Sequence, residues 1–119
     1  MKNGGKMREL LEKQEQLDKL VIETGRKDPT LLEKAVALSV EASELITAAG
    51  YKWWIWSDDG REIDEKMVRE EAVDVLHFLL SIFLSLRMNE DDIKREYDKK
   101  WRKNLQRIED AISDEGNER

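Results

Sequence analysis

Residues 72–88 read AVDVLHFLLSIFLSLRM and form the most apolar stretch of this 119-residue chain. Before Arg87 near its end, the stretch is interrupted by the polar side chains of Asp74, His77, Ser81 and Ser85. At 17 residues it is short for a membrane span. A helix in a protein core is therefore the better interpretation, and we predict one from about residue 64 to residue 88, with its later half buried on most sides.

Two pairs of carboxylates are the strongest functional signal. Glu71 and Asp74 lie where the apolar half of this helix begins, and Glu41 and Glu44 form an earlier pair with the same spacing. Residues three apart share one face of a helix, so two helices packed with these faces opposed would bring four carboxylates together. Such a group needs protons or a cation to neutralise it. Because the chain has no Cys and one His, the oxygen ligands predict Mg²⁺, with Mn²⁺ also possible, rather than zinc.

The surroundings of Asp74 favour a function over a solvated surface position. Its sequence neighbours are apolar, and an ionised carboxylate there costs several kcal/mol without partners. The chemistry that fits a carboxylate-held metal is phosphoryl transfer or hydrolysis. His77 follows on the same face, and as a lone histidine we predict it to be a hydrogen-bonded core residue rather than a ligand.

Apolar residues recur with helical spacing in three further segments. The first helix is predicted over residues 6–23. Asp28 as N-cap and Pro29 at the first helical position predict a second helix over residues 30–49. Asn89 is expected to cap a fourth helix, which carries a narrow apolar stripe. The stripe consists of Ile93, Tyr97, Trp101, Leu105, Ile108 and Ile112.

These segments predict an all-α fold, a four-helix bundle, in one domain of residues 1–113. The polar tail of residues 114–119 should fray. The helix over residues 64–88 offers more apolar surface than three helices of this length can readily cover, so we also expect subunits to associate through helices.

Composition excludes several classes of function. The net charge of −6 argues against broad nucleic-acid binding, because a basic surface is its usual footprint. The absence of Cys excludes a disulfide framework and a thiolate metal site, and it is compatible with a cytoplasmic location. The charged N-terminal segment does not have the pattern of a signal peptide, and we expect no membrane partner.

Several other polar and aromatic residues are candidates for ligand contact. Gln14 interrupts the apolar stripe of the first helix. We favour the interpretation that it is a half-exposed helix residue over the alternative that its amide pairs with the edge of a base. Trp53 belongs to a group of three tryptophans. These side chains could equally well pack in the core or form a surface on which a base stacks. Lys52 would then lie near phosphate. Lys100 and Arg107 run beside the apolar stripe of the fourth helix.

Together these residues resemble a known family. The E-x-x-E pair followed by an E-x-x-D pair is similar to the all-α nucleoside triphosphate pyrophosphatases, which include MazG-like proteins and dimeric dUTPases. Four stretches are closest to the dimeric dUTPases: QEQLD at residues 14–18, YKWW at residues 51–54, VDVLHF at residues 73–78, and the K-x-x-x-N-x-x-R pattern of residues 100–107.

The resemblance implies hydrolysis of a nucleoside triphosphate between the α- and β-phosphates, most closely of dUTP to dUMP and pyrophosphate. It also implies roles for named residues: Glu41, Glu44, Glu71 and Asp74 holding Mg²⁺, Glu44 orienting or deprotonating the water, Lys52, Lys100 and Arg107 on phosphates, and Gln14, Trp53 and Asn104 on the nucleoside. A homodimer is implied, with a tetramer as the alternative.

Two other functions remain open from the sequence. One is a MazG-like pyrophosphatase with another base preference, such as dCTP or a noncanonical nucleotide. The other is a non-catalytic helical interaction module whose acidic face is solvated or paired with basic residues.

Overall fold

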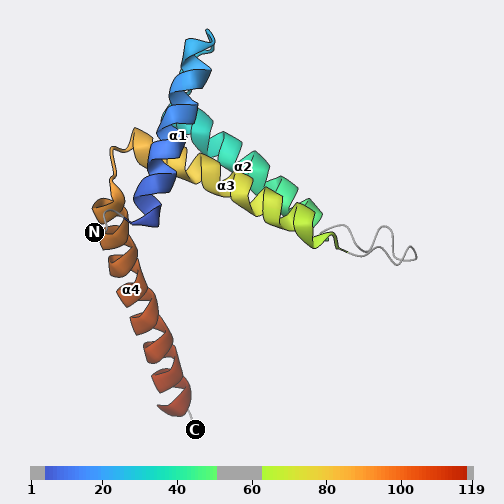
Figure 1. Cartoon of the computed structure of the whole chain (residues 1–119). Coiled ribbons are helices and arrows are strands. Elements are labelled where there is room, and N and C mark those ends of the chain that lie inside the picture. Colours follow the sequence, from blue (N-terminus) through green and yellow to red (C-terminus); the bar gives the residue numbers. More distant parts are fainter. Residues whose placement is uncertain (1–4, 51–62, 118–119) are drawn as a thin grey trace, which may run out of the picture.

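Figure 1 shows the computed structural model of the chain, which describes residues 5–50 and 63–117. The described residues are helical apart from short connections, and they contain no strand. The predicted all-α fold with four helices is confirmed. The helices are α1 (Lys6–Glu23), α2 (Leu31–Ala48), α3 (Glu65–Ser85) and α4 (Glu90–Asn117).

The start of α2 is set by Thr30, so the expectation that Asp28 caps this helix is wrong. The Thr30 hydroxyl accepts a hydrogen bond from the Glu33 backbone N–H at 3.1 Å, and a Glu33 carboxylate oxygen accepts one from the Thr30 N–H at 2.9 Å. This reciprocal pair satisfies the backbone N–H groups of both Thr30 and Glu33. The Thr30 N–H and the Lys27 ammonium, 3.3 Å away, hold the pKa of Glu33 below its ordinary value.

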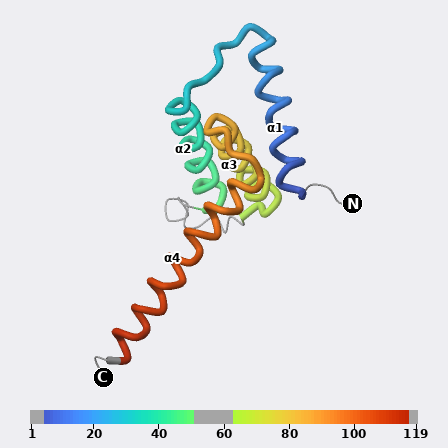
Figure 2. The backbone as a smooth tube through the Cα atoms, turned by 90° about the vertical axis from the view of Figure 1, so that its left-hand side faces the viewer, coloured from blue at the N-terminus to red at the C-terminus, as the bar shows by residue number. Residues whose placement is uncertain are grey.

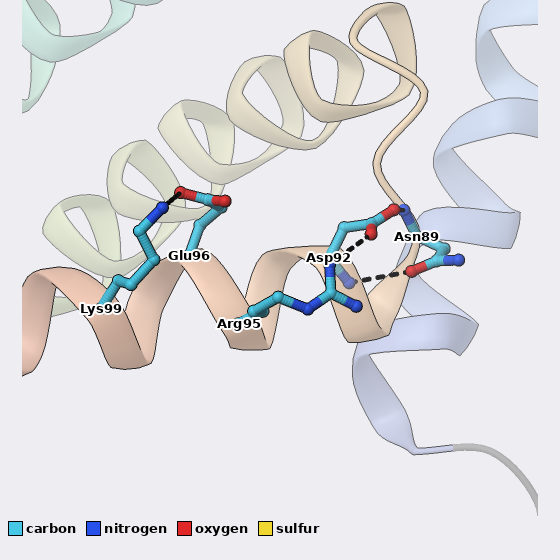
Figure 3. Close-up of polar contacts among 5 residues, drawn as sticks. All are labelled: Asn89, Asp92, Arg95, Glu96 and Lys99. Atoms are coloured by element: carbon cyan, nitrogen blue, oxygen red, sulfur yellow. Dashed lines mark hydrogen bonds and ion pairs between the residues drawn. The ribbon is translucent and has the colours of Figure 1, made fainter.

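The N-termini of α3 and α4 have side-chain caps of their own. The Asp64 carboxylate accepts hydrogen bonds from the first turn of α3. The predicted cap at Asn89 is confirmed: its side chain accepts from the Asp92 N–H at 2.8 Å, while Asp92 accepts from the Asn89 N–H at 3.0 Å (Figure 3). The Asn89 N–H and the Arg95 guanidinium lower the pKa of Asp92. Helix α4 then continues to Asn117, beyond the expected end at residue 113.

Helices α2 and α3 lie side by side and run in opposite directions, and α1 packs across α3 (Figures 1 and 2). Leu11 of α1 and Leu80 of α3 are the buried apolar side chains of the described residues. Helix α4 packs mainly against the start of α1. Its Glu90 carboxylate accepts hydrogen bonds from the backbone N–H groups of Gly5 and Arg8, which places a negative charge at the positive end of the α1 dipole.

A single chain leaves much of its apolar surface uncovered. The radius of gyration is 19.3 Å, whereas a compact domain of this length has about 13 to 14 Å. In the later half of α3, Leu80 and Ser81 are buried, whereas the other side chains are half-buried or exposed. The expectation that this half of the helix is buried on most sides is therefore not met within one chain. The α4 stripe is also exposed: Tyr97 69%, Trp101 53%, Leu105 40%, Ile108 59% and Ile112 63%.

Among the residues that the structure describes, no helix has both the length and the apolar character needed to cross a membrane.

The cap of α2 is directly testable. We expect Thr30→Ala to lower the free energy of unfolding by about 1 kcal/mol, because a donor at the helix start loses its acceptor. Urea denaturation followed by circular dichroism measures the change. Ser39→Ala, at an exposed interior position of the same helix, is the control and should not destabilise the protein. Equal stability of Thr30→Ala and the wild type would contradict the assigned cap.

Candidate metal and nucleotide site

The two predicted carboxylate pairs meet between α2 and α3. Glu41, Glu44 and Glu71 each offer a carboxylate oxygen, and these three oxygens lie within 4.8 Å of one another. Antiparallel packing produces this convergence, because each helix presents residues three apart on the face toward the other. Asp74 lies one turn after Glu71, close enough for its charge to act on both Glu41 and Glu71. We call these four residues the acidic cluster.

Burial and mutual repulsion disfavour the ionised cluster. Desolvation raises the pKa of Glu41 and Glu71, and the neighbouring carboxylates, Glu44 first in each case, raise both further. Since a raised carboxyl pKa means that the folded state binds protons more tightly than the unfolded state, ionisation of these groups at neutral pH lowers stability. A bound cation would relieve this cost.

One oxygen of the cluster has no hydrogen-bond partner among the described residues. This oxygen, Glu71 Oε2, is buried, and a buried acceptor without a donor is costly. The charged groups that act on the Glu71 carboxyl are the carboxylates of Glu44, Asp74 and Glu41, which cannot donate a hydrogen bond when ionised. An oxygen-only donor set with an unpartnered buried oxygen fits a hard divalent cation such as Mg²⁺.

A cavity of about 560 Å³ adjoins the acidic cluster. Ala37 lines it one turn before Glu41 on α2, and His77 lines it one turn after Asp74 on α3. Its further lining residues are Gln14, Asp18, Val21, Lys27, Asp28, Pro29, Glu33, Lys34, Phe78 and Ser81. A volume of this size is typical of a small-molecule site.

Gln14 is buried in the wall of this cavity, at 7% exposure, so the favoured expectation of a half-exposed position is wrong. Its Nε2 donates to Asp18 Oδ1 at 3.0 Å, and its Oε1 lies 2.7 Å from His77 Nδ1. Asp18 Oδ2 accepts from the Ser81 hydroxyl at 2.8 Å. The predicted hydrogen bond of His77 is therefore present, although its side chain borders the cavity and is not part of the core.

The structure does not bring every candidate residue to this site. Lys52 and Trp53 lie outside the described residues. Lys100, Asn104 and Arg107 are exposed on α4, which extends away from α2 and α3 (Figure 2). Within one chain, these three side chains are separated from the acidic cluster.

A family model described as dUTPase matches residues 6–91. The chain belongs to this all-α dUTPase family. No curated protein and no solved structure matched the chain.

The match to the dUTPase family covers α1, α2, α3 and the first residues of α4. It therefore includes the acidic cluster and the cavity, whereas Lys100, Asn104 and Arg107 lie beyond it. Membership of the family supports a nucleoside triphosphate diphosphatase function in general.

Three cavity residues were not anticipated from the sequence of this dUTPase-family chain: Asp18 as the anchor of Gln14, Ser81 as a donor, and Lys34 as a buried cation. Gln14 and Asp18 are four apart and share a helix face, which was a usable signal. Lys34 gave no signal, because a lysine among alternating apolar residues usually marks the exposed side of a helix.

Metal should stabilise the protein if the acidic cluster binds it. We expect millimolar Mg²⁺ to raise the melting temperature of the wild type through binding to the folded state. The increment should shrink in Asp74→Asn, which removes one charge of the cluster. Differential scanning calorimetry with and without Mg²⁺ measures both values. Glu70→Gln, at an exposed neighbouring position, should keep the full increment. Equal increments in the wild type and Asp74→Asn would exclude Asp74 as a ligand.

Proposed function

We propose that this protein is a Mg²⁺-dependent pyrophosphohydrolase that converts dUTP to dUMP and pyrophosphate. The observation that carries the proposal is the acidic cluster, with its unpartnered buried oxygen on Glu71, immediately beside a cavity of nucleoside size. Membership of the dUTPase family supports the same activity. A solvated acidic face would not explain why a carboxylate oxygen is buried without a partner.

The relative positions of the acidic cluster and the cavity support one orientation of the substrate. The acidic cluster would hold Mg²⁺, which when bound neutralises phosphate oxygens and lowers the pKa of an attacking water. The cavity would take the nucleoside, one helical turn away. In the hydrolysis, the water oxygen would form a bond to the α- or the β-phosphorus while the bond from that phosphorus to the bridging oxygen breaks, giving dUMP, pyrophosphate and a proton.

Glu44 is the best candidate to orient or deprotonate the water. It is exposed, whereas Glu41 and Glu71 are half-buried and have raised pKa values. An accessible carboxylate can accept a proton from water and exchange it with solvent. The half-buried members of the cluster are better suited to holding the metal.

Gln14 would meet the base. The contacts to His77 and Asp18 fix which side of its amide carries the oxygen, and they leave one N–H and one lone pair unused. A donor beside an acceptor can pair with the carbonyl and N–H of uracil. Trp53 and Asn104 are proposed as further nucleoside contacts, and Lys52 as a further phosphate contact, from the family resemblance.

The phosphate-binding residues of α4 would reach the site from a second copy of the chain. Helix α4 is basic in its middle: residues 94–107 contain the seven cations Lys94, Arg95, Lys99, Lys100, Arg102, Lys103 and Arg107. The acidic cluster has the complementary charge, and the exposed α4 stripe supplies an apolar contact surface. A homodimer in which each α4 reaches the partner subunit would satisfy both.

Single amide substitutions in the acidic cluster test the chemistry. Glu41→Gln, Glu44→Gln, Glu71→Gln and Asp74→Asn should each lower turnover on the order of 10²-fold or more, because metal and electrostatic contributions are lost. Pyrophosphate release from dUTP, dTTP, dCTP and ATP with Mg²⁺ is the measurement, and it also separates a dUTPase from an enzyme with another base preference.

Glu70→Gln is the matched control for these variants and should be mild, because Glu70 points about 100° away from Glu71 around the helix. Circular dichroism should show an intact fold in every variant. Near wild-type activity of both Glu44→Gln and Asp74→Asn would reject the metal site, and absence of pyrophosphate release by the wild type would reject the activity.

Mixed subunits test whether α4 acts across the dimer. A Glu71→Gln chain and a Lys100→Ala/Arg107→Ala chain should each be weakly active alone. Unfolding and refolding them together at equal amounts should restore about a quarter of the wild-type activity, because half of the dimers are mixed and each of these holds one intact site. No gain on mixing would place α4 and the cluster of one chain in the same site. Each variant refolded alone is the control.

A further inference from the structure

Lys34 is a buried cation that the proposed chemistry leaves unused. It lies in the second turn of α2 and is 9% exposed. Its Nζ donates to the Ser85 hydroxyl at 2.7 Å and to the Ser81 backbone oxygen at 3.4 Å. Both acceptors are neutral, and no ion pair of Lys34 is found among the described residues. A buried ammonium without a carboxylate is costly, so its presence calls for a reason.

Lys34 lies at the end of the cavity that is far from the acidic cluster. Lys34 lines the cavity together with Ser81. Lys34 precedes Glu41 by seven residues, and Ser81 follows Asp74 by seven, so both lie about 10 Å from the acidic cluster along their helices. A nucleotide with its phosphates at the cluster and its sugar in between therefore directs the outer edge of its base toward Lys34.

The ammonium has hydrogen-bonding capacity left for a ligand. Lys34 carries three N–H donors, of which two are directed to Ser85 and Ser81. The hydrogen bond to Ser81 is long, so this donor is only weakly satisfied. An ammonium has no acceptor, and a ligand group beside it must therefore be an acceptor.

We propose that Lys34 selects the base: its ammonium donates a hydrogen bond to the carbonyl oxygen at position 4 of uracil or thymine. Cytosine carries an amino group at this position, which would point one donor at another and leave a buried charge unpaired. Sites built to hydrogen-bond a substrate group discriminate strongly when that group is absent. The inference rests on the proposed function, because it requires the phosphates to lie at the acidic cluster.

The test is the ratio of kcat/KM for dUTP to that for dCTP in Lys34→Met. We expect the ratio to fall on the order of tenfold or more, mainly through a loss with dUTP. Methionine keeps an unbranched side chain without the charge, so the fold should be retained and the melting temperature should be unchanged or higher. An unchanged ratio in a folded Lys34→Met protein would overturn the proposal.

Ser85→Ala is the matched control. Ser85 accepts from Lys34 but does not line the cavity, so its loss perturbs the lysine from the side away from the ligand. The ratio should stay close to that of the wild type. If Lys34→Met and Ser85→Ala changed stability alike and neither changed the ratio, Lys34 would be a structural residue only.

Calorimetric binding of dUMP and dCMP separates this inference from the proposed function. Preferential binding of dUMP by the wild type, lost in Lys34→Met, would support base selection even if no pyrophosphate were released. Equal dUMP preference in both proteins would overturn base selection even if the wild type hydrolysed dUTP. Absence of binding of either nucleotide to the wild type would overturn the inference as well.

Discussion

The repulsion among the four carboxylates between α2 and α3 is the constraint on which the rest of this structure depends. The two helices must pack closely to form the core around Leu80, yet the same packing desolvates Glu41 and Glu71 and raises their pKa values. A helix pair selected for stability alone would place apolar residues there. The fold therefore accepts a local loss of stability where these carboxylates are held together.

Helix α1 gives this pair a third wall and turns a groove into a cavity. The hydrogen bonds from His77 to Gln14 and from Gln14 and Ser81 to Asp18 connect α1 with α3 through polar groups at the edge of the core. Networks of this kind are valuable only when each member is satisfied, and this one fixes the amide of Gln14 in a single orientation. The same contacts that hold α1 in place therefore set the hydrogen-bonding pattern that a ligand would meet.

Local patterns were sufficient to predict the helices and the acidic cluster. Periodicity placed the first helix at its observed bounds, and spacing of three put Glu41 beside Glu44 and Glu71 beside Asp74. What could not be predicted depends on contacts between helices. The burial of Gln14 and Lys34 follows from where α1 and α3 pack. The start of α2 depends on which of two possible N-cap residues is used, and the hydrogen bonds between Thr30 and Glu33 favour Thr30 over Asp28. The direction of α4 is likewise set by Glu90 against the start of α1, a contact between residues more than 80 positions apart.

The acidic cluster and Lys34, at the two ends of the proposed site, carry charges of opposite sign, and each lowers the stability of the free protein. At one end, carboxylates are held together, and the described residues place no compensating cation beside them. About 10 Å along the helices, Lys34 is buried and forms no ion pair with a carboxylate of the described residues. Pairing these charges with each other would stabilise the protein, but the distance between them prevents it. Under the proposed function, a metal–nucleotide complex would satisfy both ends, since the metal would neutralise the acidic cluster and the base would offer an acceptor to the Lys34 ammonium. If the proposed function is correct, binding of one substrate would relieve both the repulsion within the acidic cluster and the cost of burying Lys34, and this relief would add to the binding free energy.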